Sequence, residues 1–207
     1  MKNKKQFLII NKAILVFSLL FVCNQLISSQ QFKPHKTPTI NAFWGLGVGV
    51  NDYGIGIGTE VKSHNNLWVY GNAGLSTWGY RLTGGISFYP NTNGYKSSFS
   101  LGYSYASGIS NFEPTLEVNK YYYSSHPEYI EREVLLDLHP VSTLNLIYAY
   151  NLKVGRKSKF VFSGGYSLCL TEELYKNNSN YTLSEKSEDF IDLMAPGGII
   201  IGVKFMI

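Results

Sequence analysis

The sequence is poor in cysteine, proline and charge. It holds 2 cysteines and 7 prolines in 207 residues, and 15% of its residues are charged. With 44% hydrophobic residues and 20 glycines, this composition excludes an intrinsically disordered chain, a collagen and a coiled coil. The chain is therefore expected to fold. Its abundance of glycine, serine and aromatic residues favours an all-β protein.

No apolar run has the roughly 20 residues of a membrane-spanning helix. The run at residues 13–23 follows a basic start and precedes small and polar residues, an arrangement typical of a secretory signal peptide. We expect a signal peptide at 1–29 that is cleaved near Ser29. Two alternatives remain: residues 7–10 could extend the run into a signal anchor, or Cys23 could carry a lipid, although Phe21 and Val22 precede it where lipoproteins have a small residue.

Without residues 1–29, the chain has no excess of either charge. All bases of the leader are removed, and 14 bases then face 14 acids, so the basic isoelectric point gives no reason to expect nucleic-acid binding. Cys169 becomes the last cysteine, which excludes an intramolecular disulfide and a cysteine-ligated zinc site. The remaining 178 residues have the usual size of one domain.

After a polar tail at 30–39, eight segments alternate between large apolar and small residues. This period of two predicts eight strands within a domain at 40–207. The predicted strands begin near Ile40, Gly54, Leu67, Tyr80, Ser97, Val141, Lys159 and Gly197. The segment at 67–75 is ambiguous because its large residues fall on both parities, and we expect a bulge or a register error there.

The charges of these segments all fall on the small-residue parity. They are Glu60, Lys62, Arg81, Lys159 and Lys204. A strand surface that faces water usually carries many charges, whereas a lipid-facing surface excludes them, since a charge at the bilayer midplane costs about 2–4 kcal/mol. The pattern favours a membrane barrel with a small-residue lumen over a soluble barrel with an apolar cavity.

The lengths of the connections point to the same architecture. If both termini face the periplasm, the inward connections at 63–66, 90–96 and 152–158 are short, and the long ones at 108–140 and 171–196 both face outward. Outer-membrane barrels have this asymmetry and an even number of strands. Aromatic residues predicted on the lipid-facing parity near the periplasmic ends would form an interfacial girdle. They are Phe88, Phe99, Tyr150, Phe160 and Phe205.

On these features the chain resembles the small outer-membrane β-barrel proteins of Gram-negative bacteria. The final segment, GGIIIGVKFMI, resembles the terminal strand that the outer-membrane insertion machinery recognises. It departs from the commonest form because Ile207, not an aromatic residue, comes last, and Phe205 lies two places earlier. The resemblance implies a closed, antiparallel eight-stranded transmembrane barrel in the outer membrane, in contact with lipid and lipopolysaccharide.

The two long connections are acidic. Residues 108–140 and 171–196 each contain six acids and two bases. They could attract cations or a basic partner, or they could simply be solvated loops. No calcium-loop spacing is present, so we expect no metal site. Alternation at 115–120 and 131–138 predicts a hairpin in the first connection, in which Tyr121, Tyr122 and Tyr123 could contact a ligand or pack on the hairpin itself.

A hydrolase is an alternative because nucleophile, base and acid residues occur near the predicted outer end. Ser124 and Ser125 precede His126, and Asp137, His139 and Ser142 lie near a strand start. Their spacing does not match the barrel-type acyl hydrolases or acyltransferases, so we expect no enzyme, no catalytic residues and no cofactor.

Inside the barrel, alternate glycines at 45–49 and 54–58 remove side chains from the lumen wall. They could leave a groove, or make room for Arg81 and other bulky residues, which we favour. We also expect Glu60 and Lys204 to form an ion pair in a narrow, plugged lumen. The expected function is a structural or surface-binding role in the outer membrane; the alternatives are a lipid-modifying acyl hydrolase and a soluble exported barrel for a small apolar ligand.

Overall fold

The computed structural model describes residues 42–91, 93–119 and 129–207. The predicted signal peptide at 1–29 and tail at 30–39 lie outside the described residues. So do the tyrosines at 121–123, together with Ser124, Ser125 and His126.

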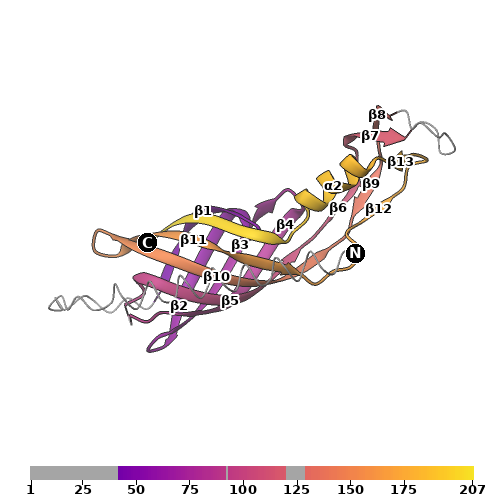
Figure 1. Ribbon diagram of the computed structural model, residues 1–207. Coiled ribbons are helices and arrows are strands. Elements are labelled where there is room, and N and C mark those ends of the chain that lie inside the picture. The colour runs from indigo at the N-terminus through magenta and orange to yellow at the C-terminus, as the bar shows by residue number, and fades with distance from the viewer. Residues whose placement is uncertain (1–41, 92, 120–128) are drawn as a thin grey trace. The chain divides into compact units, whose positions relative to one another are not determined.

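Eight antiparallel strands close into a barrel (Figure 1). They are β1 (Ala42–Val50), β2 (Gly54–His64), β3 (Leu67–Ser76), β4 (Gly79–Phe88), β5 (Lys96–Ala106), β10 (Val141–Val154), β11 (Ser158–Cys169) and β14 (Gly198–Met206). Each strand pairs with its neighbour along the barrel, and β1 pairs with β14 to close it. The predicted all-β fold with eight strands is confirmed. Apart from the predicted start at Ile40, which is not described, every predicted strand start lies within one residue of the observed start.

The two faces of the barrel wall differ in chemistry. Large apolar side chains along the strands are exposed on the outside, while the alternate residues are buried in the lumen. The exposed ones include Leu46, Ile57, Leu82, Leu101, Phe162 and Ile201. Every charged residue of these strands lies on the inward parity. The predicted orientation of the apolar parity away from the lumen is therefore confirmed.

The expected irregularity at 67–75 is present only at the start of β3, opposite Leu67 and Trp68. Trp68 and Tyr70 are buried in the lumen, whereas Leu67, Val69 and Leu75 face outward, and the pairing of β3 with β4 is continuous. The extra residue of this register shift belongs to β2, between Lys62 and His64, beside the hairpin that leads into β3. The mixed parity arises because β3 places large aromatic side chains inside, which the small-residue lumen pattern did not anticipate.

The ends of the barrel are closed by different kinds of connection. Three short connections, at 65–66, 89–95 and 155–157, meet at one end, which we name the turn end. The opposite end, which we name the loop end, carries the tight turns at 51–53 and 77–78 and both long connections. The expected separation of long and short connections is thus present in the structure.

The long connections fold together into a loop lobe. Its strands are β6 (Ile109–Phe112), β7 (Thr115–Asn119), β8 (Tyr129–Glu133), β9 (Leu136–Leu138), β12 (Tyr175–Asn177) and β13 (Thr182–Leu183). They form two three-stranded sheets, β12-β9-β6 and β13-β7-β8, each containing strands from both connections. The predicted hairpin in the first connection is confirmed by the pairing of β7 with β8.

Helix α2 (Glu185–Met194) packs on these sheets and completes a hydrophobic core. Ser184 caps it by accepting a hydrogen bond from the Ser187 backbone N–H, and two acidic residues in its first turn complement the helix dipole. The core contains Trp78, Leu116, Val118, Val134, Leu136, Leu138, Leu183 and Ile191. In the described ranges, no helix combines the length and apolarity needed to cross a membrane.

The alternate glycines of β1 make room inside the barrel, as expected, but the occupant is Tyr53 rather than Arg81. Tyr53 belongs to the turn after β1, yet its side chain is fully buried and lies against Gly47 and Gly49. Gly45 serves another purpose, because a Cβ atom there would overlap the Phe205 carbonyl of β14. A residue without a side chain is therefore required where the first and last strands meet.

We predict that Gly45→Ala lowers the free energy of unfolding by about 1–3 kcal/mol, the usual cost of overpacking. Urea unfolding of the refolded barrel measures it. The matched control is Gly71→Ala on β3, where an added Cβ meets nothing within 4 Å. Equal stabilities of the two variants would contradict the close approach of β1 and β14.

Candidate functional sites in the lumen and on the loop lobe

A buried ion pair lies in the lumen near the turn end. The Lys159 Nζ atom is 2.6 Å from the Glu60 Oε2 atom, and the Lys159 side chain is fully buried. The Tyr89 hydroxyl donates to the same carboxylate oxygen at 2.7 Å, and Lys159 also donates to the Tyr89 oxygen and the Gly94 carbonyl. These bonds offset the cost of removing two charges from water.

Aromatic side chains surround this pair. The Lys159 ammonium lies 4.2 Å from the centre of the Phe43 ring and 5.0 Å from that of Tyr89, so the rings add cation–π attraction. Together the surrounding residues form an apolar cluster that fills the lumen at the turn end. Its members are Phe43, Trp68, Tyr89, Tyr95, Ala149, Val161 and Met206.

A second ion pair lies farther toward the loop end. The Lys204 Nζ atom is 3.7 Å from the Asp52 Oδ2 atom and donates to the Asn72 Oδ1 atom at 3.1 Å. Asp52 comes from the turn at 51–53, which folds into the lumen. Its carbonyl accepts from the Thr83 hydroxyl at 2.7 Å, and Asn51 of the same turn bonds to the start of β14.

The expected pair between Glu60 and Lys204 is wrong, because each residue has a different partner. The register explains this. Strand β1 lies between β2 and β14, and its Phe43 pairs with Glu60 of β2, whereas its Gly47 pairs with Lys204 of β14. Four residues of strand correspond to about 13 Å, so the backbone positions of the two residues are offset by that length along β1. The staggered closure of the barrel brings Lys159, not Lys204, to Glu60.

A chain of hydrogen bonds continues to the mouth at the loop end. Arg81 donates to the Thr143 hydroxyl at 3.0 Å, and Thr143 donates to the Asn145 amide oxygen at 3.1 Å. Asn145 in turn donates to Ser104, which is bonded to Thr83. Side chains from the three neighbouring strands β4, β5 and β10 thus hold one another inside the lumen, in agreement with the expectation that the interior is filled.

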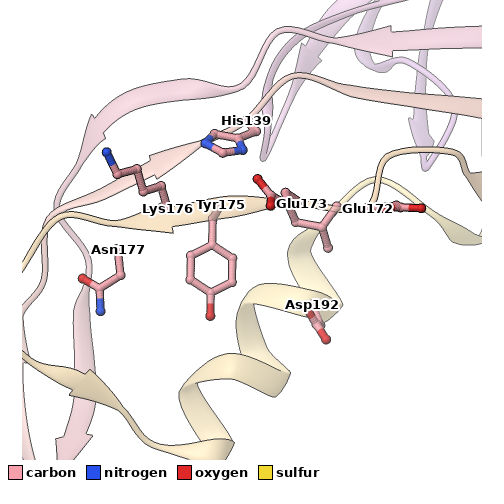
Figure 2. A pocket seen from close by; sticks show the side chains of 8 residues that line it. His139, Glu172, Glu173, Tyr175, Lys176, Asn177 and Asp192 are labelled. Atoms are coloured by element: carbon pink, nitrogen blue, oxygen red, sulfur yellow. The ribbon is translucent and has the colours of Figure 1, made fainter.

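The loop lobe carries an open cleft of about 490 Å³. Its lining combines acidic and basic side chains with Tyr175 (Figure 2). The residues are His139, Glu172, Glu173, Leu174, Tyr175, Lys176, Asn177 and Asp192. Figure 2 shows Tyr175 pointing toward α2, the helix that carries Asp192. Partial burial raises the pKa of the Tyr175 hydroxyl, and the nearby Glu188 and Asp192 carboxylates raise it further.

This cleft does not assemble a metal site from its acids. Among the described residues, no group of three or more histidine, cysteine or acidic side chains is arranged to hold a metal ion. The cleft instead gathers three exposed carboxylates, those of Glu172, Glu173 and Asp192, with Lys176 also in its lining. Such a surface attracts positively charged groups without selecting one geometry.

Asp137 and Ser142, two residues considered for a hydrolytic site, have separate hydrogen-bond partners. The Asp137 carboxylate accepts from the Asn111 backbone N–H at 2.9 Å and from the Asn178 amide at 2.5 Å. These bonds, first of all that from Asn111, lower the pKa of Asp137 and join the two long connections. The Ser142 hydroxyl bonds to Tyr103. Within the described ranges, no hydrogen bond links the side chains of Asp137, His139 and Ser142.

Sequence reasoning missed Asp52, Tyr53 and Tyr89, all of which are buried in the lumen. Each lies in a connection between strands, where polar and aromatic residues are usually exposed, so their local pattern gives no signal. The one indirect signal is the row of alternate glycines, which requires some other side chain to fill the space beside it.

Comparison with known proteins gives no relative. No family model, no curated protein and no solved structure matches the chain.

We predict that Lys159→Met destabilises the barrel by about 3–5 kcal/mol, because it leaves the Glu60 charge buried without its cation. Adding Glu60→Gln should recover most of the loss, since the uncharged amide needs no counter-ion. Urea unfolding of the two single variants and the double variant measures this coupling.

The matched control is Lys186→Met, which breaks the exposed pair with Glu117, whose atoms are 3.5 Å apart. It should change the stability by about 0–1 kcal/mol. Additive effects of the Lys159 and Glu60 substitutions would contradict the buried pair.

Proposed function

We propose that this protein is an outer-membrane β-barrel that presents the loop lobe at the cell surface as a binding module. The observation that carries the proposal is the apolar outer face, on which the barrel strands have no charged residue. Water gives no reason to keep charges off an exposed face, whereas lipid does. Export through a signal peptide at 1–29 and assembly by the outer-membrane insertion machinery follow from this location.

Two features support the direction of insertion that we propose. The turn end has only short connections, as periplasmic ends do, and the loop end has the long ones. Near the turn end, Phe88, Tyr150, Phe160 and Phe205 have exposed rings on the outer face. Aromatic rings in this position suit the boundary between lipid tails and headgroups, with lipopolysaccharide at the opposite interface.

The binding role rests on the acidity and the order of the loop lobe. Its two connections each have a formal charge of −4 and fold into sheets with a core of their own. We propose that the lobe binds a cationic partner through its cleft and that the protein is not an enzyme. The filled lumen makes the barrel an anchor for this lobe rather than a wide pore.

The two alternative functions receive less support. A soluble carrier of an apolar ligand needs its apolar parity in the lumen, whereas the large apolar side chains face outward. A lipid-modifying hydrolase needs a serine activated by a histidine, and Ser142, the described serine of the group considered, bonds instead to Tyr103.

We predict that Leu101→Arg, a change in the middle of β5 on the outer face, impairs assembly in a Gram-negative host. In lipid, the arginine costs about 2–4 kcal/mol, whereas in water an exposed arginine costs little. The measurement is the amount of protein in outer membranes that migrates differently on a gel with and without boiling.

The control is Leu193→Arg on α2, where the side chain is 82% exposed and lies outside the barrel. It should leave the heat-modifiable band unchanged. A wild-type protein that is soluble in the periplasm, or a Leu101→Arg variant that assembles normally, would refute the membrane location.

We further predict that replacing the three cleft acids weakens binding of a lysine decapeptide. With Glu172→Gln, Glu173→Gln and Asp192→Asn, three carboxylates worth about 0.3–0.5 kcal/mol each are lost, so the Kd should rise roughly tenfold. Titration of the detergent-solubilised protein at low ionic strength measures it.

A variant with the same loss of charge outside the cleft serves as the control: Glu113→Gln, Glu131→Gln and Glu133→Gln. It should retain most of the affinity. Equal losses in both variants would show attraction by the whole lobe, and no binding by the wild type would refute the cationic partner.

A further inference from the structure

Several side chains with unsatisfied polar atoms surround Lys204 in the lumen. Both carboxylate oxygens of Asp52, the hydroxyls of Tyr53 and Tyr70, and the side-chain amide nitrogen of Asn72 form no hydrogen bond with a described residue. All four side chains surround one ammonium group, with the Tyr53 and Tyr70 ring centres 4.6 Å and 6.0 Å from the Lys204 Nζ atom. We name this place the Lys204 chamber.

The Lys204 chamber is enclosed by the barrel wall and the inward-folded turn. Asp52 and Tyr53 have no exposed surface, and the exposures of Tyr70, Asn72 and Lys204 are 5%, 6% and 9%. A single buried polar group without a partner is costly, and native proteins contain few of them. Several in contact with one cation indicate that a ligand completes their hydrogen bonds.

The chemistry of the unsatisfied atoms identifies that ligand. The two hydroxyls and the Asn72 nitrogen need acceptors, as does the buried Nε atom of Arg81, whose charge acts on Asp52, while the Asp52 oxygens need donors. An anion would serve the first group but would meet the Asp52 carboxylate. A metal cation would serve Asp52 but would meet the Lys204 ammonium. Water donates and accepts, and it adds no charge to the Asp52–Lys204 pair.

We propose that the Lys204 chamber binds ordered water molecules that join Asp52, Tyr53, Tyr70 and Asn72. These waters hold the turn at 51–53 in the lumen, because the Asp52 carboxylate has no direct hydrogen bond in the described structure that would hold it. Toward the turn end the chamber is followed by the cluster around Phe43 and Trp68.

Tyrosine-to-phenylalanine variants test the proposal. If water bonds to the hydroxyls, Tyr53→Phe and Tyr70→Phe should each shift the urea midpoint of unfolding to lower concentration. The positive control is Tyr89→Phe, which removes a hydroxyl bonded to Glu60 and Lys159 and should shift the midpoint in the same direction. The negative control is Tyr150→Phe on the outer face, which should leave it unchanged.

A crystal structure of the wild-type protein grown with bromide provides the second readout, which does not depend on any variant folding. Density for water within hydrogen-bond distance of the Tyr53 and Tyr70 hydroxyls is the expected result. An anomalous bromide peak in the chamber would show that an anion binds there in place of water, and it would overturn the proposal. Unchanged or raised midpoints for both variants, or a chamber without density, would show a dry chamber and overturn it too.

Discussion

The structure depends on one constraint: all charge in the barrel wall must be accommodated in a lumen only as wide as its side chains. With an apolar outer face, Glu60, Lys159 and Lys204 have no route to solvent except along the barrel axis. Each must therefore find a partner in the interior, because an unpaired buried charge costs several kcal/mol. The network of ion pairs and hydrogen bonds through the lumen is the consequence of this inversion of the usual arrangement.

The same constraint explains how the lumen is filled. Alternate glycines leave the inner face of the first hairpin without side chains. Residues from the connections fill the lumen volume that these glycines leave. Tyr53 enters from the loop end, while Tyr89 and Tyr95 enter from the turn end. A barrel wall of small residues thus requires its connections to fold inward, since an unfilled interior would lose the contacts that stabilise it.

The strands could be predicted from the sequence because an alternation with period two depends only on which face each residue occupies. The partner of Glu60 could not, because it depends on the stagger of the closed sheet, which no local pattern records. Helix α2 was missed inside a segment read as a loop, although Ser184 and the acids that follow it are a signal for a helix start. The pairing of β9 with β12 joins two distant connections and has no local signal at all.

The order of the loop lobe favours the binding role that we propose over passive loops. Strands β6, β9 and β12 lie in the same lateral order as the barrel strands β5, β10 and β11 to which they are joined along the chain. In this sheet Ile109 and Tyr175 both pair with Leu138, just before β10 begins. Asp137 further ties the two connections by accepting from Asn111 and Asn178. A surface held in place by sheets and a hydrophobic core loses little conformational entropy when a partner binds. Solvated loops need no such framework, whereas a cleft that keeps its acidic side chains in fixed positions does.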